Sequence, residues 1–162
     1  MEFNFDVVES HEQFNVVRLK KKNMLALVSK RDFKKGEVVA HFSKAEVFDQ
    51  PTYLTVQSGI HEHIGLEPRY LQYTNHSCDP SIFIDTVKLV FVALKDIHRG
   101  DEITFFYPST EWDMDRKFIC SCGSEHCIGE IGGAKQTDRG ILSRYRLAPH
   151  ILVQLKHLHS SR

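Results

Sequence analysis

Four cysteines are the residues of this 162-residue chain whose spacing most directly suggests chemistry. Three of them form a C-x-C-x4-C cluster: Cys120, Cys122 and Cys127. Gly123 follows the second cysteine, where a turn would let three thiolates converge on a cation. A structural zinc ion takes four ligands in a tetrahedron, so the fourth comes either from Cys78, the remaining thiol, or from His126 inside the cluster. We expect the folded chain to retain about one Zn²⁺ ion.

The other common use of four cysteines is a pair of disulfides, as in secreted proteins. A bond between Cys120 and Cys122 would be strained, because only one residue separates them. The first residues, Met-Glu-Phe-Asn-Phe-Asp, are acidic, whereas a secretory leader begins with basic residues followed by apolar ones. No run approaches the ~18 apolar residues of a membrane helix. We expect an intracellular protein, cytoplasmic or nuclear, with no membrane partner.

The composition, 41% hydrophobic and 26% charged, is that of one globular domain. Lys and Arg balance Asp and Glu at 21 each, but the charges are segregated. Residues 37–134 hold 15 acids and 7 bases, a net charge of −8, whereas residues 16–36 carry +7 and residues 135–162 carry +5. The acidic stretch either neutralises its basic flanks or attracts a cationic partner. It disfavours a zinc-ribbon-like binder of nucleic acid, so we expect no direct nucleic-acid partner.

The elements that would position the cysteines are short strands. β-branched and aromatic residues gather in brief runs that predict strands at 14–19, 24–28, 38–42, 53–57 and 89–94. Turn signals separate these runs: Lys35-Gly36, Ser58-Gly59, Asp79-Pro80 and Arg99-Gly100. Residues 32–38 and 96–103 resemble each other, which indicates one strand-turn-strand corner built twice. We therefore expect a mostly β chain.

The C-terminal part has a different pattern. Pro149 stands at a typical first helical position, and Ile151, Leu152, Leu155 and Leu158 follow at near-helical spacing, which predicts an amphipathic helix. A shorter helix over residues 139–147, with Asp138 as its cap, is also expected.

Three motifs occur in an order that is typical of one family: Asn75-His76-Ser77-Cys78, then Glu102-Ile103-Thr104-Phe105-Phe106-Tyr107, then the cysteine cluster. Together they resemble the SET domain with its post-SET zinc segment, over about residues 16 to 133. The resemblance implies small sheets, a knot-like crossing of the first two motifs, and Cys78 as the fourth zinc ligand. It divides the chain into an N-terminal segment (1–15), the SET domain (16–110), the post-SET segment (111–134) and a helical tail (135–162).

The resemblance also implies a protein-lysine methyltransferase that uses S-adenosylmethionine on a basic, possibly histone-like, protein. A lysine amine with a pKa near ~10.4 is protonated at neutral pH and must lose its proton before it attacks a methyl group. A narrow aromatic channel and a nearby sulfonium both disfavour the ammonium. Tyr107 stands at the position of the catalytic tyrosine, and Phe105 and Tyr53 are the expected channel residues. Phe105 leaves room for di- or trimethylation, whereas Phe106 is expected in the core.

Four residues are expected to contact the methyl donor on the same grounds: Asn75, His76, Met24 and Ala26. The chain departs from the family here, because a Gly-x-Gly pattern usually precedes the Lys-Gly corner and the residues are Met24 and Ala26 instead. Ser81 and Gln72 replace the usual Asn and Arg, and no aromatic residue follows the last cysteine closely. These departures leave a second hypothesis, a catalytically weak or inactive SET-like module that binds proteins and is stabilised by zinc. The oligomeric state is not predicted.

Overall fold

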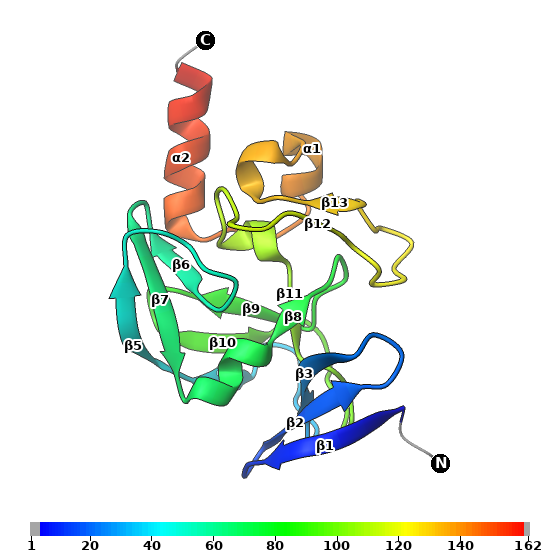
Figure 1. Ribbon diagram of the computed structural model, residues 1–162. Helices are drawn as coiled ribbons and strands as arrows, with labels where there is room; N and C mark the ends of the chain where they lie inside the picture. Colours follow the sequence, from blue (N-terminus) through cyan, green and yellow to red (C-terminus); the bar gives the residue numbers. More distant parts are fainter. Residues whose placement is uncertain (1–3, 161–162) are drawn as a thin grey trace.

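The computed structural model describes residues 4–160, which fold into several small β-sheets with short helices toward the C-terminus (Figure 1). The first sheet is antiparallel, in the order β1-β2-β3. Its strands are β1 (Phe5–Ser10), β2 (Phe14–Leu19) and β3 (Met24–Ser29). The expected division at residue 16 falls inside β2, and β1 pairs along β2, so the N-terminal segment is part of this sheet.

Two further three-stranded sheets enclose the main core. One has the order β4-β10-β9 and the other the order β5-β7-β6, both antiparallel. The strands of the first are β4 (Val38–His41), β9 (Ile82–Asp85) and β10 (Val90–Ala93). Those of the second are β5 (Ser43–Phe48), β6 (Val56–Gly59) and β7 (Glu62–Glu67). Their inward side chains, such as Phe91, Ile84 and Ile64, are fully buried.

The predicted strand at 53–57 is largely wrong. Thr52 accepts a hydrogen bond on its backbone oxygen from the Thr55 amide, and the Thr52 amide donates to Thr55 Oγ1 at 2.8 Å. These bonds close a turn, so β6 begins at Val56 and Tyr53 lies on the turn. Gly59, which the sequence predicts in a turn, is instead the last residue of β6, and its φ is not positive. The hydroxyls at 52 and 55 compete with strand pairing in a way that the apolar pattern does not reveal.

The two similar corners pair with each other. Phe33 and Ile97 exchange backbone hydrogen bonds of 2.8 Å in both directions. Asp96 Oδ1 accepts from the Lys35 amide and Asp32 Oδ1 accepts from the Arg99 amide, at 2.9 and 2.8 Å. The glycines that follow, Gly36 and Gly100, have φ of 87° and 91°. The repeated sequence therefore builds one corner twice, with each aspartate binding the other copy.

The first two motifs lie side by side at the centre of the molecule. Strands β8 (Asn75–His76) and β11 (Thr104–Phe105) form a parallel pair in which Asn75 lies opposite Thr104. Ser77 extends the contact by donating its amide proton to Phe105 O at 3.0 Å. The 3-10 helix η1 (Arg69–Tyr73) precedes β8, and η2 (Tyr107–Ser109) follows β11. Segments about 30 residues apart in sequence thus meet where the resemblance implies a crossing.

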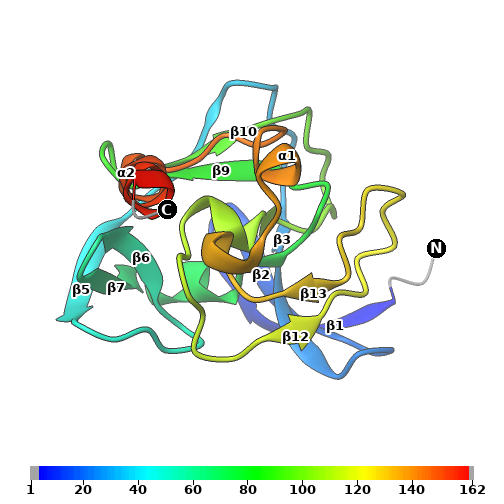
Figure 2. The ribbon, with the colours of Figure 1, turned by 90° about the horizontal axis from the view of Figure 1, so that it is seen from above.

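The remaining elements form the upper part of the molecule in Figure 1. They are β12 (Phe118–Ile119), β13 (Glu130–Ile131), η3 (Ala134–Gln136), α1 (Arg139–Leu142) and α2 (Pro149–Ser160). Pro149 begins α2 as predicted, and Figure 2 looks along this helix, which contacts β6. Asp138 caps α1 by accepting from the Gly140 and Ile141 amides, but α1 ends at Leu142, short of the predicted residue 147. Among the described residues, no helix has the length and apolar character to span a membrane.

Candidate active site

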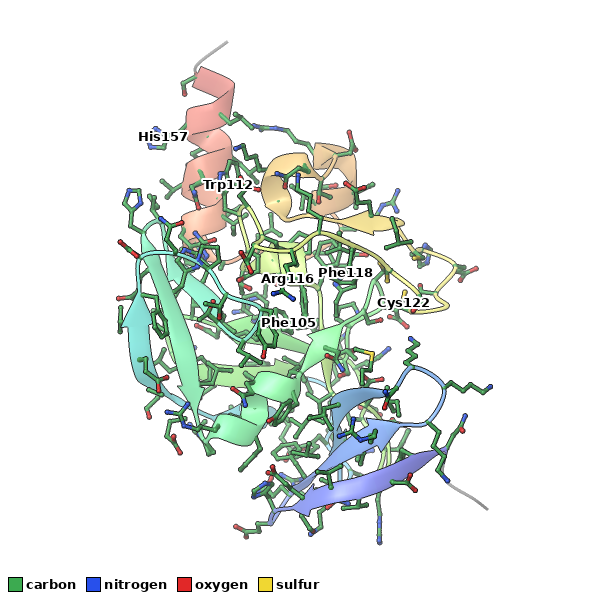
Figure 3. All side chains as sticks on the ribbon, in the orientation of Figure 1. Phe105, Trp112, Arg116, Phe118, Cys122 and His157 are labelled. Carbon is green, nitrogen blue, oxygen red and sulfur yellow. The ribbon has the colours of Figure 1, made fainter. Side chains whose placement is uncertain are left out.

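A cleft of about 680 Å³ opens between β3, the turn before β6, the β8-β11 pair and the segment that leads to the cysteine cluster. This volume is in the range of small-molecule sites in proteins. Eight of the predicted site residues line it: Met24, Tyr53, Asn75, His76, Phe105, Tyr107 and the two cysteines Cys120 and Cys122. In Figure 3 the labelled side chains of Phe105, Arg116 and Phe118 gather at this place, and all three line the cleft.

Tyr107 begins η2, directly after the strand that pairs with Asn75 and His76. Its backbone amide donates to His76 Nδ1 at 3.1 Å, and its hydroxyl donates to Thr74 O at 3.4 Å. Burial raises the pKa of the Tyr107 phenol well above its usual value, and the charges of Glu111 and Glu102 raise it further. The phenol therefore keeps its proton at neutral pH and acts in the cleft as a hydroxyl.

The aromatic residues around Tyr107 come from three segments. Phe105 is 5% exposed, and its ring centroid lies 4.6 Å from that of Tyr107. Phe118 meets Tyr107 edge-on at 6.0 Å. Tyr53 is 72% exposed at the rim, with the Arg116 guanidinium 5.7 Å from its ring centroid. Phe106 is buried in the core, stacked on Tyr145, and does not line the cleft.

Asn75 connects the cleft to β3. Its side-chain nitrogen donates to Leu25 O at 2.8 Å and to Glu102 Oε1 at 3.4 Å. Burial raises the pKa of Glu102, and the bond from Asn75 and the charge of Lys22 act against that rise. Met24 and Lys22 also face the cleft. One polar side therefore offers an amide, a carboxylate and an ammonium, groups able to bind the amino and carboxylate ends of an amino acid.

Ala26 was expected among these residues, and the structure does not place it there. Its side chain is fully buried with Val17 and Val28 and does not line the cleft. Strand β3 still borders the cleft at Met24, and the next residue, Leu25, accepts the hydrogen bond from Asn75 on its carbonyl. Pattern alone could not show that this position packs against β2 (Figure 1).

The four cysteines come together as expected. Their sulfur atoms all lie within 4.8 Å of one another, and Cys78 Sγ is 3.9 Å from Cys120 Sγ. Zinc–sulfur bonds of ~2.3 Å in a tetrahedron place sulfurs ~3.8 Å apart, so the spacing suits zinc. Burial raises the pKa of Cys78, and raises that of Cys120 to about 11, so a cation is needed for both to be thiolates. His126 is exposed and lies outside this group, so the fourth candidate ligand is Cys78.

His76 lies between the cysteine cluster and Tyr107. Burial lowers its pKa to about 4, so its ring is neutral at pH 7. Nδ1 accepts the Tyr107 amide proton, which leaves the proton on Nε2, 3.3 Å from Cys78 Sγ. The ring is also edge-on to Phe118 at 5.9 Å. A residue predicted only as a cofactor contact thus joins the metal candidate to the candidate catalytic tyrosine.

The sequence did not predict several lining residues, among them Glu102, Glu111 and Phe118. Glu102 was in a quoted motif without a role, and Glu111 follows Tyr107 by four residues in a segment assigned only to the zinc. Phe118 comes before the cysteine cluster, whereas the family's aromatic residue was expected after the last cysteine. A single apolar or acidic residue in a loop gives no periodic signal, so these positions became apparent only from the fold.

Comparison with known proteins agrees with this geometry. The SET domain family model matches residues 24–108. Methyltransferase flvH of Aspergillus flavus is 42% identical over 118 residues, which cover 72% of this chain and 66% of that protein. A histone-lysine N-methyltransferase of Candida albicans, H3 lysine-36 specific, is 35% identical over 77 residues, 44% of this chain and 9% of that one. The chain thus spans less than two thirds of these relatives.

Two solved structures share the fold. KRYPTONITE in complex with mCHG DNA and SAH has a TM-score of 0.56 at 20% identity, covering 75% of this chain and 30% of that chain. The methyltransferase domain of human SETMAR, a histone-lysine N-methyltransferase, has a TM-score of 0.50 at 16% identity, covering 82% and 59%. The two motifs that meet at β8 and β11 lie inside the matched residues 24–108. The chain belongs to the SET domain family.

Proposed function

We propose that this protein transfers methyl groups from S-adenosylmethionine to the side-chain amine of a lysine in a basic, possibly histone-like, protein. The observation that supports this most is the convergence of Tyr107, Phe105 and Asn75 on one cleft, from strands that only the fold brings together. The curated relatives named as methyltransferases support the reaction class, and those named as histone-lysine enzymes support the substrate class.

S-adenosylmethionine, when bound, supplies a methyl group on a positively charged sulfur. The residues suited to hold it are Asn75, His76 and Met24. The side chains of Lys22 and Glu102, which are a base and an acid, line the cleft beside them. Asn75 Oδ1, which has no partner within residues 4–160, and the Glu102 carboxylate are acceptors for an ammonium, and Lys22 is a donor for a carboxylate. Met24 is 38% exposed and contributes apolar surface to the cleft.

The side chains of the cleft would prepare the lysine for attack. Phe105 and Phe118 give the amine an apolar wall, with Tyr53 at its exposed rim, and such surroundings disfavour the charged form of the amine. Tyr107 keeps its proton and orients the amine through its hydroxyl, in line with the methyl group. The Phe105 side chain has no hydroxyl that could hold a water molecule, which supports di- or trimethylation rather than a single transfer.

Zinc has a structural role in this proposal. With four thiolates as ligands, no position is open for a water molecule or a substrate. The ion would hold Cys78, and through it His76 and the floor of the cleft, against the segment that carries Phe118. The relatives named as histone-lysine enzymes support a nuclear site of action for this protein. The absence of direct nucleic-acid contact stays a prediction.

The test is calorimetric titration with S-adenosylmethionine, followed by a labelled-methyl assay on a histone mixture and on small amines. Binding together with transfer to protein lysine supports the proposal. Transfer to small amines alone would contradict the protein substrate. Binding without transfer to any amine would instead favour the SET-like module that binds proteins.

A further inference from the structure

Glu111 is a buried acid that the reaction described above does not use. It lies four residues after Tyr107, and its amide donates to Tyr107 O at 2.9 Å. The residue is 8% exposed and lines the same cleft as Tyr107, Phe105 and Tyr53. It is therefore the buried carboxylate on the aromatic side of the cleft, whereas Glu102 lies beside Asn75.

Its two carboxylate oxygens have different surroundings. Oε2 accepts hydrogen bonds from the backbone amide of Gln57 at 2.9 Å and from Thr110 Oγ1 at 2.8 Å. These two bonds fix the side chain in one orientation. Gln57 is itself held, because its Oε1 accepts from the Trp112 amide at 2.8 Å. The fixed carboxylate is thus supported from two separate segments.

Oε1 has no partner among the described residues. Within residues 4–160, the fully buried side-chain N and O atoms that lack a hydrogen-bond partner are Asn15 Oδ1 and His63 Nδ1. Glu111 Oε1 also lacks a partner but is not one of these atoms, so it is not fully buried. Glu111 lines the cleft, and Oε1 is the carboxylate oxygen that no described residue occupies. No Lys or Arg of the described chain forms an ion pair with Glu111, whereas Glu62, Glu46 and Glu37 are each paired. The carboxylate lacks a cation that a substrate ammonium could supply.

We infer that Glu111 binds the ammonium of the substrate lysine and accepts its proton before methyl transfer. This inference rests on the proposed function. The N–H bond of the ammonium breaks and an O–H bond forms at Oε1, giving a neutral amine and a neutral carboxylic acid. The amine lone pair then forms the N–C bond while the C–S bond breaks and its electron pair stays on sulfur. Glu111 afterwards releases its proton to water.

The protonation behaviour of Glu111 suits this role. Burial raises its pKa to about 7, against hydrogen bonds from Gln57 and Thr110 that lower it. A base is most effective when its pKa is close to the working pH. An unassisted lysine, with a pKa near ~10.4, would be neutral in fewer than about one molecule in a thousand at pH 7.

The test compares the wild-type protein with Glu111→Gln in kcat/KM from pH 6 to pH 10. Glutamine keeps an oxygen for Gln57 and Thr110 but is not a base. We expect activity about 100-fold lower at pH 7, rising with pH until the two proteins converge near pH ~10, where the amine loses its proton unaided. Asp113→Asn is the matched control, since Asp113 is an exposed acid outside the cleft lining, and it should keep the wild-type profile. A Glu111→Gln profile parallel to the wild-type profile would overturn the inference.

Peptide binding without the methyl donor gives a second measurement. The probes are an arginine-rich peptide with one lysine and the same peptide with norleucine at that position. Glu111→Gln should weaken binding of the lysine peptide by about fivefold or more and leave the norleucine peptide unchanged, because only the former has an ammonium. Equal losses for both peptides would contradict the inference.

The two claims can fail separately. If the wild-type protein transfers methyl groups and Glu111→Gln has a parallel pH profile, the role of Glu111 fails and the proposed function stands. If no amine is methylated by the wild-type protein, the proposed function fails, and the peptide comparison still decides whether Glu111 binds the ammonium. Should Glu111→Gln not fold, Glu111→Asp keeps a carboxylate, and it should retain the wild-type dependence on pH.

Discussion

His76 Nδ1 accepts the backbone proton of Tyr107 at 3.1 Å. The other ring nitrogen lies 3.3 Å from Cys78 Sγ, so one buried imidazole contacts both a candidate zinc ligand and the candidate catalytic residue. Residues that contact metal ligands fix the orientation of those ligands, and the bound ligands in turn hold these residues in place. We therefore expect the zinc site and the cleft to depend on each other.

Removing the fourth thiol tests this dependence. Cys78→Ser should lower the zinc content from about one ion per chain to near zero, and lower the melting temperature, because structural zinc contributes to folding. It should also weaken S-adenosylmethionine binding by about tenfold or more, through the loss of order at His76. Elemental analysis and calorimetry measure the two effects.

The matched control is His126→Ala, which removes the competing ligand candidate. His126 is exposed and outside the group of converging sulfurs, so this variant should keep its zinc. Zinc loss on His126→Ala with retention on Cys78→Ser would show that the fourth ligand has been assigned wrongly.

Stability should depend on pH through the buried histidines, two of which, His63 and His150, lie near the base of α2 while His76 lies at the cleft. Burial, and then the charge of His150, lower the pKa of His63, and burial also lowers the pKa of His150. Both folded-state values lie below the unfolded value of ~6.5, so the unfolded chain binds more protons as the pH falls through that value. The free energy of unfolding should therefore decrease between pH 7.5 and pH 5.5.

Urea unfolding of the wild-type protein and His63→Leu at these two pH values measures the effect. Glu111 acts in the opposite direction, since its pKa is raised, so the informative quantity is the difference between the two proteins. His63→Leu removes a titrating group whose Nδ1 is buried without a partner, and it should lose less stability than the wild type. An equal loss in both proteins would exclude His63 as a source of the dependence.

Phe105→Tyr should shift the product toward monomethyl-lysine. The Phe105 ring lies against Tyr107, and an added hydroxyl there would hold water in the space that a second methyl group needs. Mass spectra of the product peptide report the distribution. Phe48→Tyr, on the exposed strand β5, is the control and should leave it unchanged. A wild-type enzyme that makes only monomethyl-lysine would contradict the role of Phe105.

Much of the fold could be predicted from short-range patterns. The β-branched run at 14–19 became β2 without a change of bounds, because its inward residues, such as Val16, are fully buried. Pro149 marked the start of α2, and the fixed φ of proline suits that position. The four cysteines were correctly grouped, since the spacing of three of them predicted a cluster and the resemblance supplied Cys78 as the fourth.

The rest depends on contacts between distant segments. Glu111 faces the cleft because Gln57, more than 50 residues earlier, donates to it. Ala26 is buried because it packs with Val17 of β2 and Val28 of β3 in one apolar cluster. Neither contact produces a periodic pattern of apolar residues from which it could be predicted. The turn at Thr52 and Thr55 likewise depends on hydroxyl bonds rather than on the apolar pattern.

The most direct test of the account is methyl transfer by Tyr107→Phe. The tyrosine hydroxyl makes one hydrogen bond among the described residues, 3.4 Å long, so its loss should change the free energy of unfolding by less than ~1 kcal/mol. We predict that the variant folds, keeps its zinc and binds S-adenosylmethionine, while the single-turnover rate on a basic protein falls by about 100-fold or more. A wild-type rate in the folded variant would contradict the account.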